Sequence, residues 1–105
     1  MSGLDNTSFT VRSSTATSET LTNNDYVLLC NPSGGAQTVN LPAVASVQPG
    51  RAYFVRTTGT TNTVTLDGFG SETIDGASTK MLASGAIHGA LVVTDGTAWF
   101  TIEQF

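Results

Sequence analysis

The chain contains one cysteine and one histidine, Cys30 and His88, residue types that often act as nucleophiles or bind zinc. A zinc site needs several such ligands, and a Cys–His nucleophilic pair needs a further group that orients the base. Neither residue is flanked by such groups. We therefore interpret Cys30 as a small buried hydrophobe and His88 as a strand residue at a surface or subunit contact. A single cysteine excludes an intrachain disulfide and favours synthesis in a reducing cytosol.

Four carboxylates in the second half of the chain, Asp67, Glu72, Asp75 and Asp95, are the other candidates for chemistry. Two of them could form an acid–base pair, and Asp67, Glu72 and Asp75 could offer oxygen ligands to calcium. The three aspartates each precede a glycine, however, which is where turn geometry alone places an Asp. Their spacing matches no calcium-loop pattern. We therefore predict no catalytic residues, no metal, no cofactor and no enzymatic activity.

Three aromatic residues, Tyr26, Tyr53 and Trp99, would form a sugar-stacking platform if they were exposed. Trp99 lies in the run Ala98-Trp99-Phe100, which places apolar side chains on both faces of an extended chain. We therefore interpret Trp99 as a residue of the core or of an interface.

The composition excludes several classes of function. The chain has 105 residues, which indicates one domain, and a formal net charge of −4 with no basic run, so it lacks the electrostatic signature of nucleic-acid binding. No apolar segment approaches the length of about 20 residues that spans a bilayer. Only 11% of the residues are charged, and Lys80 is the only lysine. A surface rich in Ser and Thr suits subunit packing, although the β-propensity of Thr explains much of it.

The stretch from Asn24 to Pro42 is the one around which we expect the fold to be organised. The apolar run Tyr26–Cys30 is typical of a strand buried on both faces, and the alternating segment Thr38–Leu41 is typical of a half-buried strand. With the turn residues Asn31–Gly35 between them, they predict a β-hairpin. A strand covered on both faces needs a second layer, either from the same chain or from another copy of it.

The rest of the chain predicts further short strands and no helix longer than one turn. Strands are expected at the ranges Arg51–Thr57, Thr63–Leu66, Thr79–Ala83, Ala86–Thr94 and Ala98–Gln104. The last two flank the tight turn Asp95-Gly96, which is the strongest hairpin signal in the chain. Eight to ten short antiparallel strands with frequent turns predict an all-β domain, a β-sandwich or a jelly-roll-like barrel.

Residues 1–16 differ from the rest because they are rich in Ser and Thr and contain little that would form a core. We predict an extended N-terminal arm over residues 1–16 and a β-sandwich domain over residues 17–105. In this interpretation Leu4, Phe9, Val11 and Arg12 contact a partner. The alternative is an ordinary first strand preceded by a frayed terminus.

Four segments in order carry a family resemblance: LTNNDYVLLCNPSGGAQTVNLP, GRAYFVR, NTVTLDGFGSETIDGAST and LVVTDGTAWFTI. Together they resemble a β-rich domain of tailed-phage structural proteins, and the resemblance covers residues 17–105. That family occurs in tail fibres, head fibres and capsid decoration proteins, commonly as trimers, and has no shared active site. The resemblance therefore implies no catalytic residues.

Within that family, we expect a trimeric capsid decoration (cement) protein, because only a short segment precedes the resemblance. Such a protein would be made in the cytoplasm of a bacterial host and would bind the major capsid protein on the outer surface of the phage head. We predict Tyr26, Leu28 and His88 at the subunit interface. One alternative is a tail- or head-fibre tip that binds host glycans through its loops (residues 31–36, 59–62 and 68–71). Another is a free-standing carbohydrate-binding or adhesin-like β-sandwich.

Overall fold

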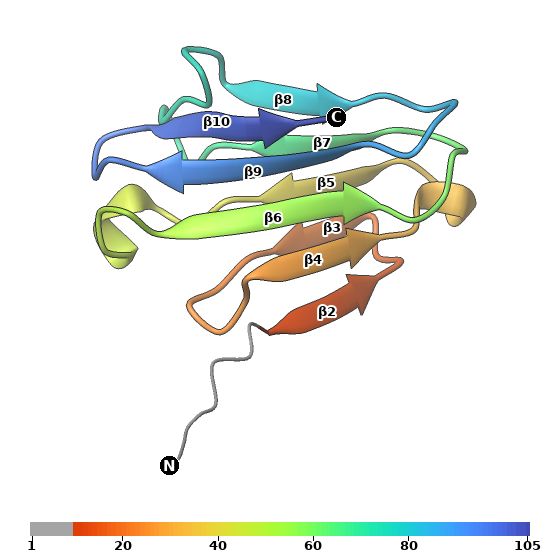
Figure 1. Ribbon diagram of the computed structural model, residues 1–105, viewed down its shortest axis with the longest axis horizontal. Helices are drawn as coiled ribbons and strands as arrows, with labels where there is room; N and C mark the ends of the chain where they lie inside the picture. Colours follow the sequence, from red (N-terminus) through yellow and green to blue (C-terminus); the bar gives the residue numbers. More distant parts are fainter. Residues whose placement is uncertain (1–9) are drawn as a thin grey trace.

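The computed structural model describes residues 10–105, which form two mixed β-sheets that face each other (Figure 1). The five-stranded sheet has the order β10-β9-β6-β4-β2, and the four-stranded sheet has the order β3-β5-β7-β8. The strands of the first sheet are β2 (Val11–Ser14), β4 (Val27–Cys30), β6 (Ala52–Thr57), β9 (Gly89–Thr94) and β10 (Trp99–Gln104). Those of the second are β3 (Ser18–Thr20), β5 (Gln37–Asn40), β7 (Val64–Asp67) and β8 (Thr79–Leu82). Within these residues the helices are two single 3-10 turns, η1 (Pro32–Gly34) and η2 (Val44–Ser46).

The first six of these strands alternate between the two sheets. β2, β4 and β6 are parallel neighbours in one sheet, and β3, β5 and β7 are parallel neighbours in the other. The chain thus winds three times around the core before β8, β9 and β10 return antiparallel to their neighbours. The prediction of an all-β domain is confirmed, but the prediction of antiparallel pairing throughout is wrong.

The predicted hairpin between the apolar run and the alternating segment is also wrong, because β4 and β5 lie in different sheets. Six residues, 31–36, connect them, and an extended chain of that length spans up to about 20 Å. This is ample for crossing the roughly 10 Å between packed sheets. The turn η1 directs the crossing: Pro32 is buried, and the Asn31 side chain accepts a hydrogen bond from the Ser33 N–H. A hairpin turn and a crossover between sheets have the same local sequence signals, so the turn residues do not distinguish them.

The similar segments Thr38–Leu41 and Thr63–Leu66 are confirmed as strands and prove to be spatial neighbours. β5 and β7 pair in parallel, with Thr38 opposite Thr65 and Val39 opposite Leu66. When the two segments are aligned by sequence, Thr38 corresponds to Thr63. The pairing in the sheet is therefore shifted by two residues from that alignment. A shift of two keeps the same side chains on the same face, which explains why both strands need the same alternation.

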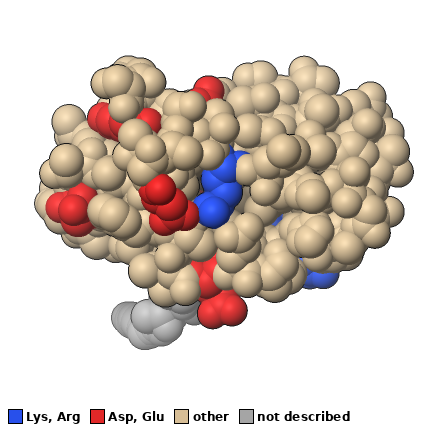
Figure 2. Space-filling view, turned by 90° about the horizontal axis from the view of Figure 1, so that it is seen from above, with Lys and Arg blue, Asp and Glu red and all other residues tan. Residues whose placement is uncertain are grey.

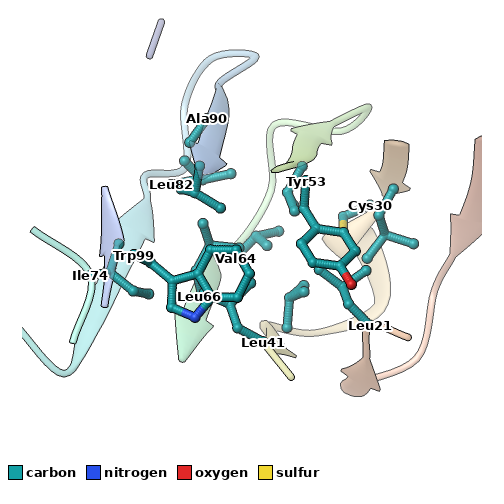
Figure 3. Packing of buried hydrophobic residues seen from close by; sticks show 14 of the residues in the cluster. Leu21, Cys30, Leu41, Tyr53, Val64, Leu66, Ile74, Leu82, Ala90 and Trp99 are labelled. Carbon is teal, nitrogen blue, oxygen red and sulfur yellow. The ribbon is translucent and has the colours of Figure 1, made fainter. Parts of the chain in front are cut away.

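The hydrophobic core fills the space between the sheets (Figure 3). Its largest members are Trp99 and Tyr53, whose ring centroids lie 5.7 Å apart, and neither side chain is exposed. The Tyr53 hydroxyl donates to the main-chain oxygen of Thr22 at 2.9 Å, which satisfies its polar end inside the core. The other core residues are Leu21, Leu28, Cys30, Val39, Leu41, Val44, Val55, Val64, Leu66, Ile74, Leu82, Ala90 and Val92.

The predicted boundary at residue 16 is not a boundary of the fold. β2 is the edge strand of the five-stranded sheet and pairs in parallel with β4, from Val11 opposite Val27 to Ser14 opposite Cys30. Residues 11–14 therefore belong to the domain, because their main chain completes a ladder that β4 leaves open. This is the predicted alternative of an ordinary first strand. Leu4 and Phe9 lie outside the described residues.

The Asp95-Gly96 hairpin is confirmed. β9 and β10 pair antiparallel, with Trp99 opposite Thr94. The Asp95 carboxylate accepts hydrogen bonds from the Thr97 and Ala98 N–H groups at 2.9 and 3.0 Å, and Gly96 adopts a φ of +98°. These main-chain hydrogen bonds, that of Ala98 first, lower the pKa of Asp95. Turn chemistry thus accounts for this carboxylate.

Candidate functional site

The two sheets differ in the faces that they turn away from the core. On the four-stranded sheet, alternation and register place mostly short polar side chains outward. They are Ser18, Thr20, Thr38, Asn40, Thr65, Asp67, Thr79 and Met81. This is the pattern of a sheet face in contact with water.

The five-stranded sheet shows the opposite pattern on its outer face. The outward side chains of β2, β4, β6, β9 and the start of β10 are Val11, Ser13, Val27, Leu29, Ala52, Phe54, Arg56, Leu91, Val93 and Phe100. Ser13 and Arg56 are the polar members of this set, and Glu103 on β10, opposite Leu91, also points outward at the edge of the sheet. Across the sheet, Val27, Phe54 and Leu91 lie in one register row, which makes the apolar surface continuous over three central strands. We call this surface the outer apolar face.

Phe105 adds an aromatic ring to the outer apolar face. Its N–H donates to the Gly89 oxygen at 3.0 Å, and the Gly89 N–H donates to its oxygen at 3.1 Å. The Phe105 ring packs edge-on against Phe54, with centroids 6.4 Å apart, and it remains half exposed. A Cβ at residue 89 would lie 2.8 Å from the Phe105 ring, so a larger residue there would push the ring away from this position.

The three residues predicted at the subunit interface, Tyr26, Leu28 and His88, do not lie on one surface. Leu28 points into the core and is wholly buried, so it offers no surface to a second subunit, and that prediction is wrong. The sequence marked the correct strand, but alternation places Val27 and Leu29 outward instead. Tyr26 is half buried just before β4. His88 is half buried beside the outer apolar face, with Nδ1 3.1 Å from the main-chain oxygen of Phe105. Roles for Tyr26 and His88 in an interface stay predictions.

Of the residues predicted to contact a partner from an arm, Val11 and Arg12 are described. Val11 is on the outer apolar face and is 59% exposed. Arg12 points the other way, toward the space between the sheets, where it forms ion pairs within its own chain. Its Nε lies 2.9 Å from Asp25 Oδ1, and its Nη1 lies 2.7 Å from Glu19 Oε2. Arg12 is therefore held inside the domain and is not a free contact residue.

The Arg12 ion pairs lie at the edge of the core, where β2 and β3 are the edge strands of the two sheets. Glu19 Oε1 also accepts from the Ser14 hydroxyl at 2.5 Å, and Asp25 Oδ2 accepts from Arg12 Nη2 and the Thr22 N–H. Inward-pointing charges of this kind protect exposed sheet edges from pairing with other chains. The edges of β2 and β3 are thus poor sites for adding a further strand.

The same cluster predicts acid sensitivity. The Arg12 hydrogen bonds hold the pKa of Asp25 below its usual value, and the Ser14 hydroxyl, followed by Arg12, does the same for Glu19. A depressed folded-state pKa gives stability above the unfolded-state pKa, near 4, that is lost as the pH falls through the folded value. We expect wild type to lose about 1 kcal/mol more unfolding free energy than Arg12→Gln as the pH falls from about 5 to 3. Parallel pH dependences in urea unfolding would contradict this.

Cys30 and His88 do not form a nucleophilic pair. Cys30 points into the core and is wholly buried, whereas His88 contacts Phe105 at the surface. Burial raises the pKa of the Cys30 thiol to about 12, so the reactive thiolate is scarce at neutral pH. The interpretation of Cys30 as a buried hydrophobe is confirmed.

This burial predicts the reactivity of the thiol. We expect Cys30 to resist a thiol reagent at pH 8 in the native protein and to react within minutes in concentrated denaturant, measured by absorbance or mass. Labelling at equal rates in both conditions would show that the core around β4 opens readily.

Two of the three candidate calcium ligands, Glu72 and Asp75, are engaged with different groups, whereas the Asp67 carboxylate accepts no hydrogen bond from the other described residues. Glu72 Oε1 accepts from the Val44 N–H at 3.0 Å. Asp75 accepts from the hydroxyl and N–H of Thr101, which lower its pKa, and it pairs with Lys80 at 3.2 Å. Within residues 10–105, no three side chains of the His, Cys, Asp and Glu types come together to hold a metal ion.

Trp99 and Tyr53 do not form a sugar-stacking platform, because both are wholly buried. Trp99 is a core residue, as the sequence indicates. Exposed aromatic rings occur instead at Phe69, Phe100 and Phe105, in the described part of the chain. The signal for Phe100 is the run Ala98-Trp99-Phe100, which is apolar on both faces; Phe105 is not part of such a run.

Charge is sparse on the surface. Figure 2 looks onto the end of the molecule that β8 and β10 form, and there charged side chains lie singly or in small groups on a largely uncharged surface. Arg56, the lone cation of the outer apolar face, has no ion-pair partner among the described residues. Over those same residues, no helix is long and apolar enough to cross a membrane.

Comparison of the sequence with known proteins gives no support to any one family. No family model matches the chain, and no curated protein matches it. The resemblance to tailed-phage structural domains therefore stays a prediction, and the outer apolar face is the feature on which a functional argument can be built.

Proposed function

We propose that this protein is a non-enzymatic structural component of a tailed-phage virion, a trimer that decorates the outside of the capsid and stabilises it. The observation that carries the proposal is the contrast between the polar outer face of the four-stranded sheet and the outer apolar face of the five-stranded sheet. A protein that worked alone would need only the first kind of surface. The family resemblance supplies the virion setting and the trimer.

The size of the outer apolar face is that of the largest apolar patch on a typical monomer, a patch that is often functional. Five strands about 4.8 Å apart and roughly 17 Å long give a flat footprint of about 400 Å². Contiguous apolar patches on monomeric proteins rarely exceed a few hundred Å² and are often functional at that size. Covering the face with another copy of the chain removes it from water, which favours association by the hydrophobic effect.

A closed arrangement fits this surface better than an open one. If three copies turn the outer apolar face toward a common axis, each face is covered and none is left to recruit further chains. The polar faces of the four-stranded sheets then point outward. We describe the fold accordingly as a two-layer β-sandwich with a polar and an apolar exterior.

The proposal is tested first by sedimentation equilibrium over a wide dilution range. We expect the mass of three chains to persist down to about micromolar concentration. A stable monomer there would overturn the trimer. Co-sedimentation with purified heads that lack the protein then tests capsid binding, and a trimer that does not bind heads would overturn the decoration role alone.

The fibre-tip alternative loses the aromatic residues first considered for it, since Trp99 and Tyr53 are buried. Its loops remain candidates, and one of them borders the pocket described next.

A further inference from the structure

A pocket of about 500 Å³ lies on the four-stranded sheet, where three parallel strands end together. Thr20, Asn40 and Asp67 are the last residues of β3, β5 and β7, and they occupy one register row. The turn after β7 and the loop after β5 form the walls. Pockets that hold small molecules have volumes of about 300 to 1,000 Å³. The lining includes Asn40, Asp67, Gly68, Phe69 and Gly70.

The two walls are braced against each other before any ligand arrives. Glu72 extends from the turn after β7, and its Oε1 accepts from the Val44 N–H at the start of η2. The Glu72 N–H closes the turn by donating to the Phe69 oxygen at 2.9 Å. Gly68 lets the turn fold tightly, because a Cβ there would lie 2.3 Å from the main-chain oxygen of Glu72. A pocket held in this way loses little conformational entropy on binding.

The lining combines one aromatic wall with hydrogen-bond acceptors. Phe69 is 58% exposed, although an aromatic ring of its size is normally buried in a core. The Asp67 carboxylate accepts no hydrogen bond from other described groups. Asn40 donates through Nδ2 to Ser18 and Thr20, so its Oδ1 remains available as an acceptor. No basic residue lines the pocket.

We propose that this pocket binds a neutral, hydroxyl-rich ligand, of which a pyranose ring of a glycan is the matching class. The C–H face of such a ring is attracted to the electron-rich face of Phe69. Its hydroxyls donate to Asp67 and Asn40, where hydrogen bonds to an ionised acceptor are the stronger kind. An anion is disfavoured by Asp67, and a bare cation finds too few ligands.

This inference does not depend on the proposed function. Self-association uses the outer apolar face of the five-stranded sheet, whereas the pocket lies on the other sheet. A trimer without sugar binding and a monomer with sugar binding are therefore both observable results, and each overturns only one proposal.

The test is a ¹⁵N–¹H NMR titration of the protein with a panel of neutral methyl pyranosides, with glycerol as a hydroxyl-bearing probe that lacks a ring face. At least one pyranoside is expected to shift the amide signals of Asn40, Gly68 and Gly70 at millimolar concentration, and glycerol is not. Phe69→Ala should weaken that binding about tenfold. Asp67→Asn, which keeps the shape and removes the charge, should weaken it about fivefold.

Two matched variants control for loss of surface and loss of charge. Met81→Ala removes another exposed apolar side chain from the same sheet, and Glu103→Gln removes another exposed carboxylate. Both should bind as wild type does. The proposal is overturned if no pyranoside shifts these signals, if the controls weaken binding as much as the pocket variants, or if calcium chloride alone shifts the same amides.

Discussion

Replacing Leu29 with Glu is expected to convert the proposed trimer into folded monomers. Leu29 lies outward on β4, near the middle of the outer apolar face, and a carboxylate there would have to be desolvated in the assembled state. In the monomer the new carboxylate would lie opposite Arg56 on β6, where a cross-strand ion pair supports the sheet. Sedimentation equilibrium should therefore show the mass of one chain, and circular dichroism should show an unchanged β signal.

Thr38→Glu provides the matched control for this prediction. Thr38 lies outward near the middle of the four-stranded sheet, between Ser18 and Thr65, so the substitution adds the same charge to the other exterior. We expect this variant to keep the mass of wild type. If Leu29→Glu remains associated, or if both variants dissociate, the outer apolar face is not the surface through which the chains meet.

Replacing Trp99 with Ala is expected to cause the largest loss of stability in the domain. Trp99 is the largest wholly buried side chain, and its removal leaves a cavity beside Tyr53 between the two sheets. Large-to-small changes of this kind cost about 3 to 5 kcal/mol. Since a domain is stable by only about 5 to 15 kcal/mol, the variant should be close to unfolding at room temperature.

Urea unfolding in the Leu29→Glu background measures this loss without a contribution from subunit dissociation. Ile102→Ala, a change at a 63% exposed position of the same strand, is the control and should cost less than about 1 kcal/mol. A loss below about 1 kcal/mol for Trp99→Ala would mean that the indole is not packed in the core. Trp99→Phe should recover much of the stability, because it refills part of the cavity.

Features that depend on neighbouring residues could be predicted from the sequence. Alternation between apolar and polar residues located the strands at Thr38–Leu41 and Thr63–Leu66. The Asp95-Gly96 turn predicted its hairpin, because the carboxylate caps main-chain N–H groups only two and three residues away. The same interpretation does not account for the carboxylates of the other two aspartates that precede a glycine. Asp67 is the last residue of strand β7, and the carboxylate of Asp75 accepts from Thr101, which is 26 residues away.

The sequence also indicated that the Tyr26–Cys30 strand is apolar on both sides, but not which side the chain itself covers. The structure buries Leu28 and Cys30 and leaves Val27 and Leu29 outward. Both sides carry apolar residues of similar size, so alternation gives no preference. The choice depends on the side from which the four-stranded sheet approaches.

The connections between strands, and the residues that come into contact, could not be predicted from any one segment. The segment 31–36 carries turn signals that suit a hairpin as well as a crossing between sheets, and the crossing occurs because β2 and β6 flank β4 on both edges. The partners of Arg12 and the pocket at Asp67 follow from that winding. They join residues that are distant in sequence, and the parallel register that aligns them leaves no trace in any one segment.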